Sequence, residues 1–400
     1  MHGAGADDAN GADGAVDGGA HGAGREPKPG AQLLVAGGGT GGHVFPALAV
    51  AKEWLGRPPL GEGEGARSAV IVGTQSGFEA RLVPQAGLPL ETIRAAGLKG
   101  IGGAKLVRNL AMLPAGILDS AAIIRRNHFA AAFGVGGYAS GPMMLMAMMN
   151  WIPSVIFEPN VEAGFTNRLL ADMATRVAVA HRETAERFGR KAVMTGCPIR
   201  REFLAIPRRE GPRTGPFHIL ITGGSRGALP INRAVVDSLD RLVLRKNQLF
   251  VVHQTGERDY NAVRVAYARR QFNAEVLPFI ENMAERSAQA DLIVCRSGAI
   301  TVAEISAAGR AAIFIPFGAA TDAHQTRNAQ AMQDAGAARL LPQPELSPER
   351  LTEEIFALMD HPERLAQMEE RARELARPRA VEDIVDLLEE VSKRKQVARP

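Results

Sequence analysis

Two glycine-rich segments occur where an apolar run gives way to a helical pattern. The first covers residues 37–43 (GGGTGGH) and the second covers residues 223–228 (GGSRGA). Glycine permits tight turns and close approach of the backbone to a ligand, and the free amides at the start of a helix attract anions. The first segment is no P-loop, because no Lys-Ser/Thr pair follows its glycines. We predict two phosphate-binding turns, although each segment could also be only a tight turn between strand and helix.

His43 ends the first glycine-rich segment, where a helix is expected to begin. Its unperturbed pKa of about 6.5 suits a general base, and the positive end of a helix dipole disfavours the protonated imidazole. The alternative is a histidine that only hydrogen-bonds carbonyl groups of the loop. Position alone does not separate these two roles.

A third strand-turn-helix pattern spans residues 295–304 (CRSGAITVAE). Amides at its helix start would stabilise a diphosphate, and Glu304 could accept hydrogen bonds from ribose hydroxyls. Residues 322–328 (DAHQTRN) carry amide and imidazole groups that suit sugar hydroxyls. Asp322 and His324 lack a third metal ligand, so we predict no metal site. The chain also has no Asp-x-Asp pair, so helix ends and basic side chains must stabilise a diphosphate leaving group.

The elements that must position these groups form two series of short apolar runs separated by helix-length segments. Buried parallel strands give such runs, and their alternation with helices predicts βαβ units. The runs of the first series cover residues 33–36, 69–72, 131–135, 155–157 and 177–179. The runs of the second series cover residues 218–222, 249–252, 275–277, 292–295 and 312–315. We therefore predict an α/β protein with two doubly wound, Rossmann-like domains facing a shared cleft.

The domain boundaries follow from composition. Residues 1–30 are too poor in apolar side chains to fold and predict a disordered tail. A Pro-, Arg- and Gly-rich stretch near residue 200 divides an N-terminal domain, 31–200, from a C-terminal domain, 201–378. Pro378 should break the helical path, and we expect the last helix, 379–400, to pack back on the N-terminal domain.

Composition and charge exclude several classes of protein. The 400 residues are 46% hydrophobic and 22% charged, which is typical of a folded protein, and no segment is apolar enough to span a membrane. The net charge is +4 although the tail is acidic, so the folded part is basic and could attract nucleic acid, anionic lipid or phosphorylated small molecules. Aromatic residues make up only 5%, which argues against a nucleic-acid platform. Two cysteines favour a reducing compartment.

Four ordered motifs resemble the MurG family of bacterial peptidoglycan glycosyltransferases. They lie at residues 38–46, 136–142, 223–228 and 295–304, and the likeness runs from about residue 32 to the last helix. The resemblance implies a GT-B fold without a cofactor. It also implies an inverting transfer of N-acetylglucosamine from UDP-N-acetylglucosamine to the muramoyl 4-hydroxyl of undecaprenyl-linked lipid I, which gives lipid II. The expected place is the cytoplasmic face of the cell membrane, as a peripheral protein, with no nucleic-acid partner.

The resemblance also implies roles for individual residues. His43 would be the catalytic base, and His324 would be a neighbour of the sugar site. The implied substrate-binding residues are, for the cleft, Thr40, Gly41 and Gly42; for the donor sugar, Asn160 and Gln325; for the donor diphosphate region, Arg200 and Ser225; for the uracil, Ile280; and for diphosphate and ribose, Ala299, Ile300, Thr301, Val302, Ala303 and Glu304.

Four positions, in three segments, depart from the family pattern. Residues 157–160 read Phe-Glu-Pro-Asn where His-Glu-Gln-Asn is usual, which removes two polar side chains beside the expected sugar site. Cys197 stands where Asn is usual, and Arg226 where Gln is common. None of these changes removes His43, Glu304 or Gln325.

A lipid-linked acceptor requires a surface that docks on an anionic membrane. The cations Lys99, Lys105 and Arg108 interleave with apolar Ile101, Leu106, Leu110 and Leu113, a pattern that favours the membrane interface. The alternative is an ordinary amphipathic helix with its leucines turned inward. Two rival functions also remain: another GT-B enzyme, such as a glycolipid transferase or a UDP-N-acetylglucosamine 2-epimerase, and a nucleotide-sugar sensor without catalysis.

Overall fold

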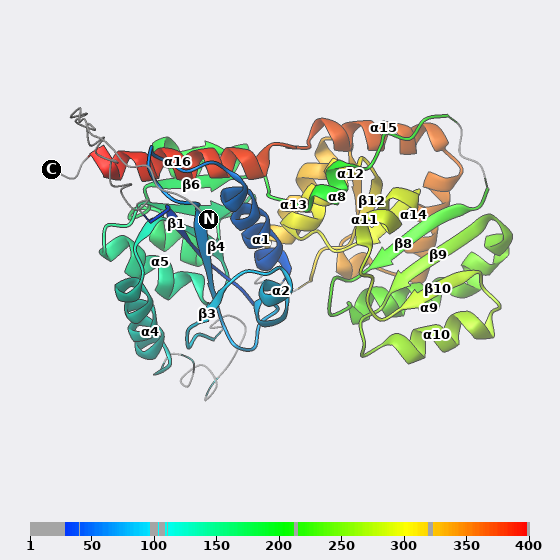
Figure 1. The fold of residues 1–400 in the computed structure, drawn as a ribbon. Coiled ribbons are helices and arrows are strands. Elements are labelled where there is room, and N and C mark those ends of the chain that lie inside the picture. Colours follow the sequence, from blue (N-terminus) through cyan, green and yellow to red (C-terminus); the bar gives the residue numbers. More distant parts are fainter. Residues whose placement is uncertain are drawn as a thin grey trace, which may run out of the picture.

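The computed structural model describes residues 29–39, 41–96, 103, 109, 111–211, 215–318 and 323–397. The predicted tail therefore lies almost wholly outside the described residues, as do Thr40, Asp322 and, apart from Leu113, the predicted membrane-docking segment. The chain forms two α/β lobes side by side (Figure 1). Both central sheets are entirely parallel, so the predicted fold class is confirmed.

The first lobe holds a seven-stranded sheet in the order β3-β2-β1-β4-β5-β6-β7. Its strands are β1 (Gln32–Gly37), β2 (Ser68–Gly73), β3 (Leu90–Thr92), β4 (Phe129–Gly136), β5 (Ser154–Glu158), β6 (Arg176–Val179) and β7 (Ala192–Met194). Its helices are α1 (Gly41–Gly56), α2 (Glu79–Gln85), α4 (Leu113–Arg126), α5 (Ser140–Met149), α6 (Phe165–Leu170) and α7 (Arg182–Phe188), followed by the 3₁₀ turn η1 (Gly189–Lys191).

The second lobe holds a six-stranded sheet in the order β10-β9-β8-β11-β12-β13. Its strands are β8 (Phe217–Thr222), β9 (Leu249–Gln254), β10 (Ala274–Leu277), β11 (Leu292–Cys295), β12 (Ala311–Phe314) and β13 (Ala338–Leu340). The helices from the linker onward are α8 (Arg201–Leu204), α9 (Leu229–Leu242), α10 (Tyr260–Arg269), α11 (Met283–Gln289), α12 (Ala299–Ala308), α13 (Ala323–Asp334), α14 (Pro348–Met359), α15 (Pro362–Glu374) and α16 (Ala380–Val397), with 3₁₀ turns η2 (Val243–Gln248) and η4 (Gln343–Glu345).

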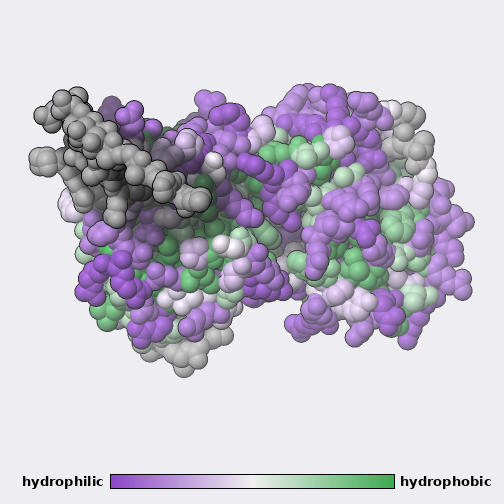
Figure 2. Space-filling model, viewed as in Figure 1, coloured by the Kyte–Doolittle hydropathy of each residue, from purple (hydrophilic) through white to green (hydrophobic). Residues whose placement is uncertain are grey.

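Both faces of each sheet are covered by helices, which explains the unbroken apolar runs. In β1, Leu33 and Val35 join a core with α1 and α16, whereas Leu34 and Ala36 join a core with α4 and α5. Successive side chains of a strand point to opposite faces, so a strand buried on both faces is apolar at every position. The surface seen in Figure 2 is mostly hydrophilic, with smaller hydrophobic areas on both lobes.

The C-terminal helix α16 leaves the second lobe and lies along the first (Figure 1). Ile384 and Leu388 are fully buried against the first lobe's core. Arg57, which directly follows α1, pairs with Asp386 and with Glu389 of α16, the latter at 3.3 Å. The chain thus crosses between the lobes twice, once near residue 200 and once at the start of α16. Among the described residues, no helix combines the length and the apolar character that a membrane crossing needs.

Candidate active site

A cleft of about 400 Å³ lies between the lobes, where the carboxyl ends of β1, β5, β8, β9 and β11 meet. The first lobe contributes Gly41, Gly42, His43, Phe45, Pro159 and Asn160 to its wall, and the second lobe contributes Ser225, Ile280 and the start of α12. In open α/β sheets, ligands bind outside the carboxyl ends of the strands. The structure therefore brings most of the predicted site residues to one cleft.

The turn after β11 leads into α12, whose first backbone amides point toward the cleft end of the helix. The first hydrogen bond within this helix runs from the amide of Val302 to the carbonyl of Gly298, so the amides of residues 299–301 have no partner within the helix. Ala299, Ile300, Thr301 and Glu304 line the cleft. Val302 and Ala303 instead line a second cavity of about 250 Å³ on the other side of the helix. Helical periodicity turns their side chains away from the main cleft, so their place in the donor cradle stays a prediction.

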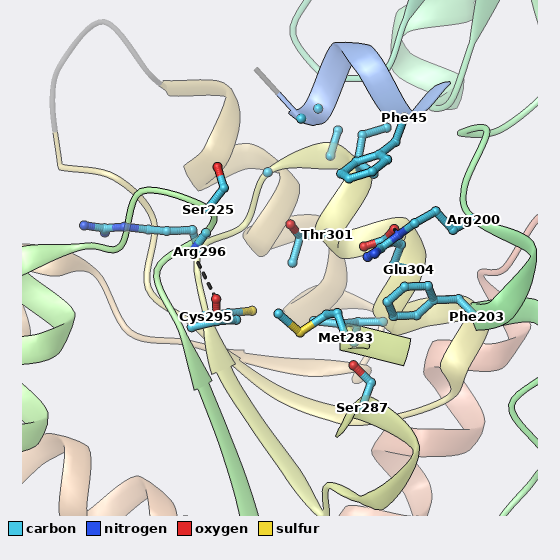
Figure 3. Close-up of a pocket in the computed structure, with 18 of the residues that line it drawn as sticks. Phe45, Arg200, Phe203, Ser225, Met283, Ser287, Cys295, Arg296, Thr301 and Glu304 are labelled. Atoms are coloured by element: carbon cyan, nitrogen blue, oxygen red, sulfur yellow. Dashed lines mark hydrogen bonds and ion pairs between the residues drawn. The ribbon is translucent and has the colours of Figure 1, made fainter. Parts of the chain in front are cut away.

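Glu304 is paired with Arg200 inside the cleft (Figure 3). The Arg200 Nε donates to Glu304 Oε1 at 2.8 Å, and the guanidinium lies 4.8 Å from the ring centroid of Phe45 and 4.7 Å from that of Phe203. Burial raises the pKa of the Glu304 carboxyl, while the bond to Arg200 opposes that shift. The pair joins a carboxylate of the second lobe to an aromatic ring of α1 in the first.

His43 lies in the first turn of α1 and faces the cleft. Burial lowers its pKa, while the charge of Glu79 and a hydrogen bond with the backbone of Gly38 oppose the shift. A Cβ added at Gly136 would lie 3.1 Å from the imidazole Cδ2, so the loop after β4 packs directly on the ring. A lowered pKa favours the neutral imidazole, which is the form that accepts a proton.

Asn160 is held from both lobes at the edge of the cleft. Its Nδ2 donates to Glu158 Oε1 at 3.0 Å, and its Oδ1 accepts from Asn328 Nδ2 of α13 at 3.3 Å. Phe157, one of the departures from the family pattern, is fully buried 6.4 Å from the ring of Phe133, whereas Pro159 lines the cleft. The change at residue 157 therefore adds to the core, and only the change at residue 159 alters the wall of the cleft.

Gln254 is a site residue that the sequence analysis missed. Its Nε2 donates to the carbonyl of Gly224 at 2.9 Å and to Thr222 Oγ1 at 3.1 Å, and its Oε1 accepts from the amide of Ile280 at 2.8 Å. Gln254 therefore fixes the second glycine-rich turn relative to Ile280. The available signal was its place directly after the apolar run of β9, where parallel strands present polar groups to a site.

Gln325 does not reach the cleft wall in this structure. Its Oε1 accepts from the amide of Phe317 at 3.1 Å, and its carbonyl accepts from Ser297 Oγ at 2.9 Å. The neighbouring His324 lines the cleft instead. Within the described part of the chain, no three His, Cys, Asp or Glu side chains gather in an arrangement that could hold a metal ion.

Comparisons with known proteins agree with this architecture. Residues 33–179 match the glycosyltransferase family 28 N-terminal domain, and residues 218–384 match its C-terminal domain. A protein of Myxococcus xanthus is 43% identical over 350 residues, which cover 87% of this chain and 90% of that protein. One of Pelobacter propionicus is 43% identical over 370 residues, covering 87% and 96%. Both are named UDP-N-acetylglucosamine--N-acetylmuramyl-(pentapeptide) pyrophosphoryl-undecaprenol N-acetylglucosamine transferase.

Solved structures show the same relationship. The crystal structure of MurG from Acinetobacter baumannii aligns with a TM-score of 0.71 at 33% identity, covering 90% of this chain and 99% of that one. The UDP-GlcNAc 2-epimerase from Neisseria meningitidis aligns with a TM-score of 0.62 at 13% identity, covering 91% and 100%. The epimerase likeness concerns the fold alone.

Proposed function

Because the chain belongs to the MurG family of N-acetylglucosamine transferases, we propose that it moves N-acetylglucosamine from UDP-N-acetylglucosamine to the muramoyl 4-hydroxyl of lipid I. The product is lipid II, an intermediate of peptidoglycan synthesis. The observation that carries the proposal is that His43 of the first lobe and the start of α12 in the second lobe line the same cleft.

The donor binds to the second lobe, residues 201–378. The free amides of residues 299–301 and the Arg200 guanidinium stabilise the diphosphate, since an oriented helix end and a fixed cation cost no reorganisation as charge develops. Glu304 accepts hydrogen bonds from the ribose, and Ile280 contacts the uracil. Ser225, in the second glycine-rich turn, contacts the donor diphosphate region. Asn160 reaches the sugar from the opposite lobe.

The acceptor binds to the first lobe, residues 31–200 together with helix α16. His43 accepts the proton of the attacking hydroxyl while the hydroxyl oxygen forms a bond to the anomeric carbon. The bond between that carbon and the diphosphate oxygen breaks, and UDP leaves with the bonding electron pair. Attack opposite to the leaving group inverts the anomeric centre. Gly41 and Gly42 line the cleft beside the base and leave room for the acceptor.

The first lobe docks on the cytoplasmic face of the membrane. Exposed apolar side chains gather on α4, α5, α6 and the loops that follow them, a set we call the apolar surface: Leu118, Met149, Trp151, Phe165, Leu169 and Met173. Trp151 is 87% exposed and Phe165 74% exposed, which is unusual for such large rings. Arg168 lies exposed among them and suits anionic headgroups. The predicted docking cations Lys99, Lys105 and Arg108 lie outside the described residues and stay a prediction from the sequence.

The test is incubation of the protein with labelled UDP-N-acetylglucosamine and lipid I, followed by identification of the products. We expect label in lipid II and release of UDP in equal amounts. Conversion of the nucleotide sugar to its 2-epimer without lipid I would instead show an epimerase. Tight binding of the nucleotide sugar with no conversion would show a sensor.

A further inference from the structure

Glu79 is a fully buried carboxylate for which the proposed mechanism so far has no use. It is the first residue of α2 and lies under the first glycine-rich segment. Its Oε2 accepts from the amide of Gly39 at 2.7 Å, and its Oε1 accepts from the amide and the Oγ1 of Thr74, both at 2.8 Å. Burying a carboxylate costs free energy unless hydrogen bonds compensate for the lost hydration. The three hydrogen bonds to Glu79 provide that compensation.

Glycines leave the space that this carboxylate fills. A Cβ added at Gly38 would lie 2.2 Å from Glu79 Oε1, one at Gly73 would lie 2.4 Å from its Cγ, and one at Gly77 would lie 2.1 Å from its Oε2. The glycines at these positions therefore serve the protein's own carboxylate. The glycine-rich segment needs its small residues on this side whether or not a ligand is bound.

The same segment carries His43. The imidazole hydrogen-bonds to the backbone of Gly38, the residue whose Cα packs on Glu79, and the next amide, that of Gly39, is bonded to the carboxylate. The negative charge of Glu79 raises the pKa of His43 against the effect of burial.

Further ionisable groups among the described residues lie around this turn of α1, and His324 lines the same cleft. Tyr138, from the loop after β4, has ring atoms 3.7 Å from the place of a Cβ on Gly39. Arg200 stacks on Phe45, and its charge is paired with Glu304. Among the described residues of the first lobe, Glu79 is the carboxylate whose charge acts on His43.

We propose that Glu79 is a positioning residue for the acceptor half of the reaction. Its carboxylate fixes the glycine-rich segment through the Gly39 amide and balances the positive charge that His43 acquires with the acceptor's proton. This inference rests on the proposed function, because it assigns Glu79 to the same proton transfer. Glu79 acts only through His43 and the loop and does not itself touch substrate.

Glu79→Gln tests the proposal by removing the charge at nearly constant shape. We expect kcat to fall roughly 10–100-fold, while the KM for UDP-N-acetylglucosamine stays within about twofold of the parent. Activity rises with pH as His43 loses its proton. Because loss of the negative charge lowers the pKa of His43, the acid limb of the kcat profile should move to lower pH.

Two further variants separate charge from structure. Glu158→Gln is the matched control, since Glu158 is also buried and accepts from the amides of Asn160 and Gly164 but does not act on His43. We expect it to change donor kinetics and to leave the acid limb in place. Glu79→Asp keeps the charge, but the shorter side chain moves the carboxylate away from the Gly39 amide. It should lower kcat about tenfold without moving the limb, and it carries the test if Glu79→Gln does not fold.

The outcomes divide cleanly. A folded Glu79→Gln protein with the parental kcat and acid limb overturns the proposal, and so does a Glu79→Asp protein with the parental kcat. A lower kcat with an unmoved limb in Glu79→Gln also overturns it, because the residue is then merely structural. A parent that transfers no sugar refutes the proposed function instead. NMR titration of the His43 imidazole in the parent and in Glu79→Gln then decides the role of Glu79 without turnover.

Discussion

Replacing Glu304 tests the donor site directly. In the proposed complex its carboxylate accepts hydrogen bonds from the ribose, and such charge-assisted bonds contribute about 1.5–3 kcal/mol each. In the free protein the carboxylate already accepts from Arg200 at 2.8 Å, so the ribose hydroxyls add to or replace an existing bond. The net loss of UDP binding free energy in Glu304→Ala should therefore be about 1–3 kcal/mol, which weakens the affinity about 5–150-fold.

The loss of stability in Glu304→Ala depends on Arg200, which keeps its charge after its carboxylate partner is removed. Without Glu304, the Arg200 guanidinium remains between Phe45 and Phe203 with no carboxylate. Its side chain is 26% exposed, so water solvates part of the charge. We expect the free energy of unfolding to fall by about 1–3 kcal/mol, below the cost of breaking a fully buried pair. The variant should therefore fold and allow a binding measurement.

Isothermal titration calorimetry with UDP provides the assay, and Glu202→Ala provides a matched control. Glu202 is an exposed neighbour whose charge acts on Glu304. The hydrogen bond from Arg200 goes to Glu304 and not to Glu202. The control should bind UDP within about twofold of the parent, as is usual for a surface charge. If folded Glu304→Ala binds UDP as tightly as the control does, Glu304 takes no part in holding the donor and the assignment fails.

Three other predictions concern catalysis, membrane docking and acid stability. His43→Ala should slow the chemical step roughly 10²–10⁴-fold and leave UDP affinity unchanged; a single-turnover rate within about threefold of the parent would rule out the base. Replacing Trp151, Phe165 and Leu169 with Ser should reduce sedimentation with anionic vesicles and preserve UDP binding, and unchanged sedimentation would show that the apolar surface does not dock. Burial lowers the pKa of His253 to about 3. Below pH 6.5, His253 therefore binds a proton in the unfolded chain but stays neutral in the folded protein. Urea unfolding should show that the parent loses about 2 kcal/mol more between pH 6.5 and 4.5 than His253→Gln does, and equal losses would contradict this.

Sequence patterns predicted the strands that lie inside the sheets and missed three at their edges. The ten predicted runs correspond to β1, β2, β4, β5 and β6 in the first lobe and to β8 through β12 in the second. The missed strands, β3, β7 and β13, have three residues each and end a sheet. An edge strand is buried on fewer sides, so its residues need not be apolar and no run marks it.

The candidate site was predictable where its chemistry lies within one segment. The glycine-rich turns and the start of α12 are contiguous in sequence, so spacing alone located them. Glu79 was not predictable in this way, because its partner Gly39 lies 40 residues earlier and contributes only a backbone amide. Val302 and Ala303 were predicted as part of one contiguous motif. In the structure they line the second cavity, because a helix turns some of its residues away from any one side, so their role at the donor stays a prediction.

Two of the contacts that cross between the lobes lie close to α12. Arg200 joins Glu304 to Phe45 of α1, while Asn328 joins Asn160 to the carbonyl of Ser297, just before the helix. The helix that would hold the donor diphosphate is therefore linked to the first lobe at two places, just before its start through Asn328 and one turn further on through Arg200. A ligand that changes the position of α12 must change contacts to the first lobe as well. Because binding couplings are reciprocal, rearrangement of α1 on acceptor binding must alter donor affinity by the same free energy.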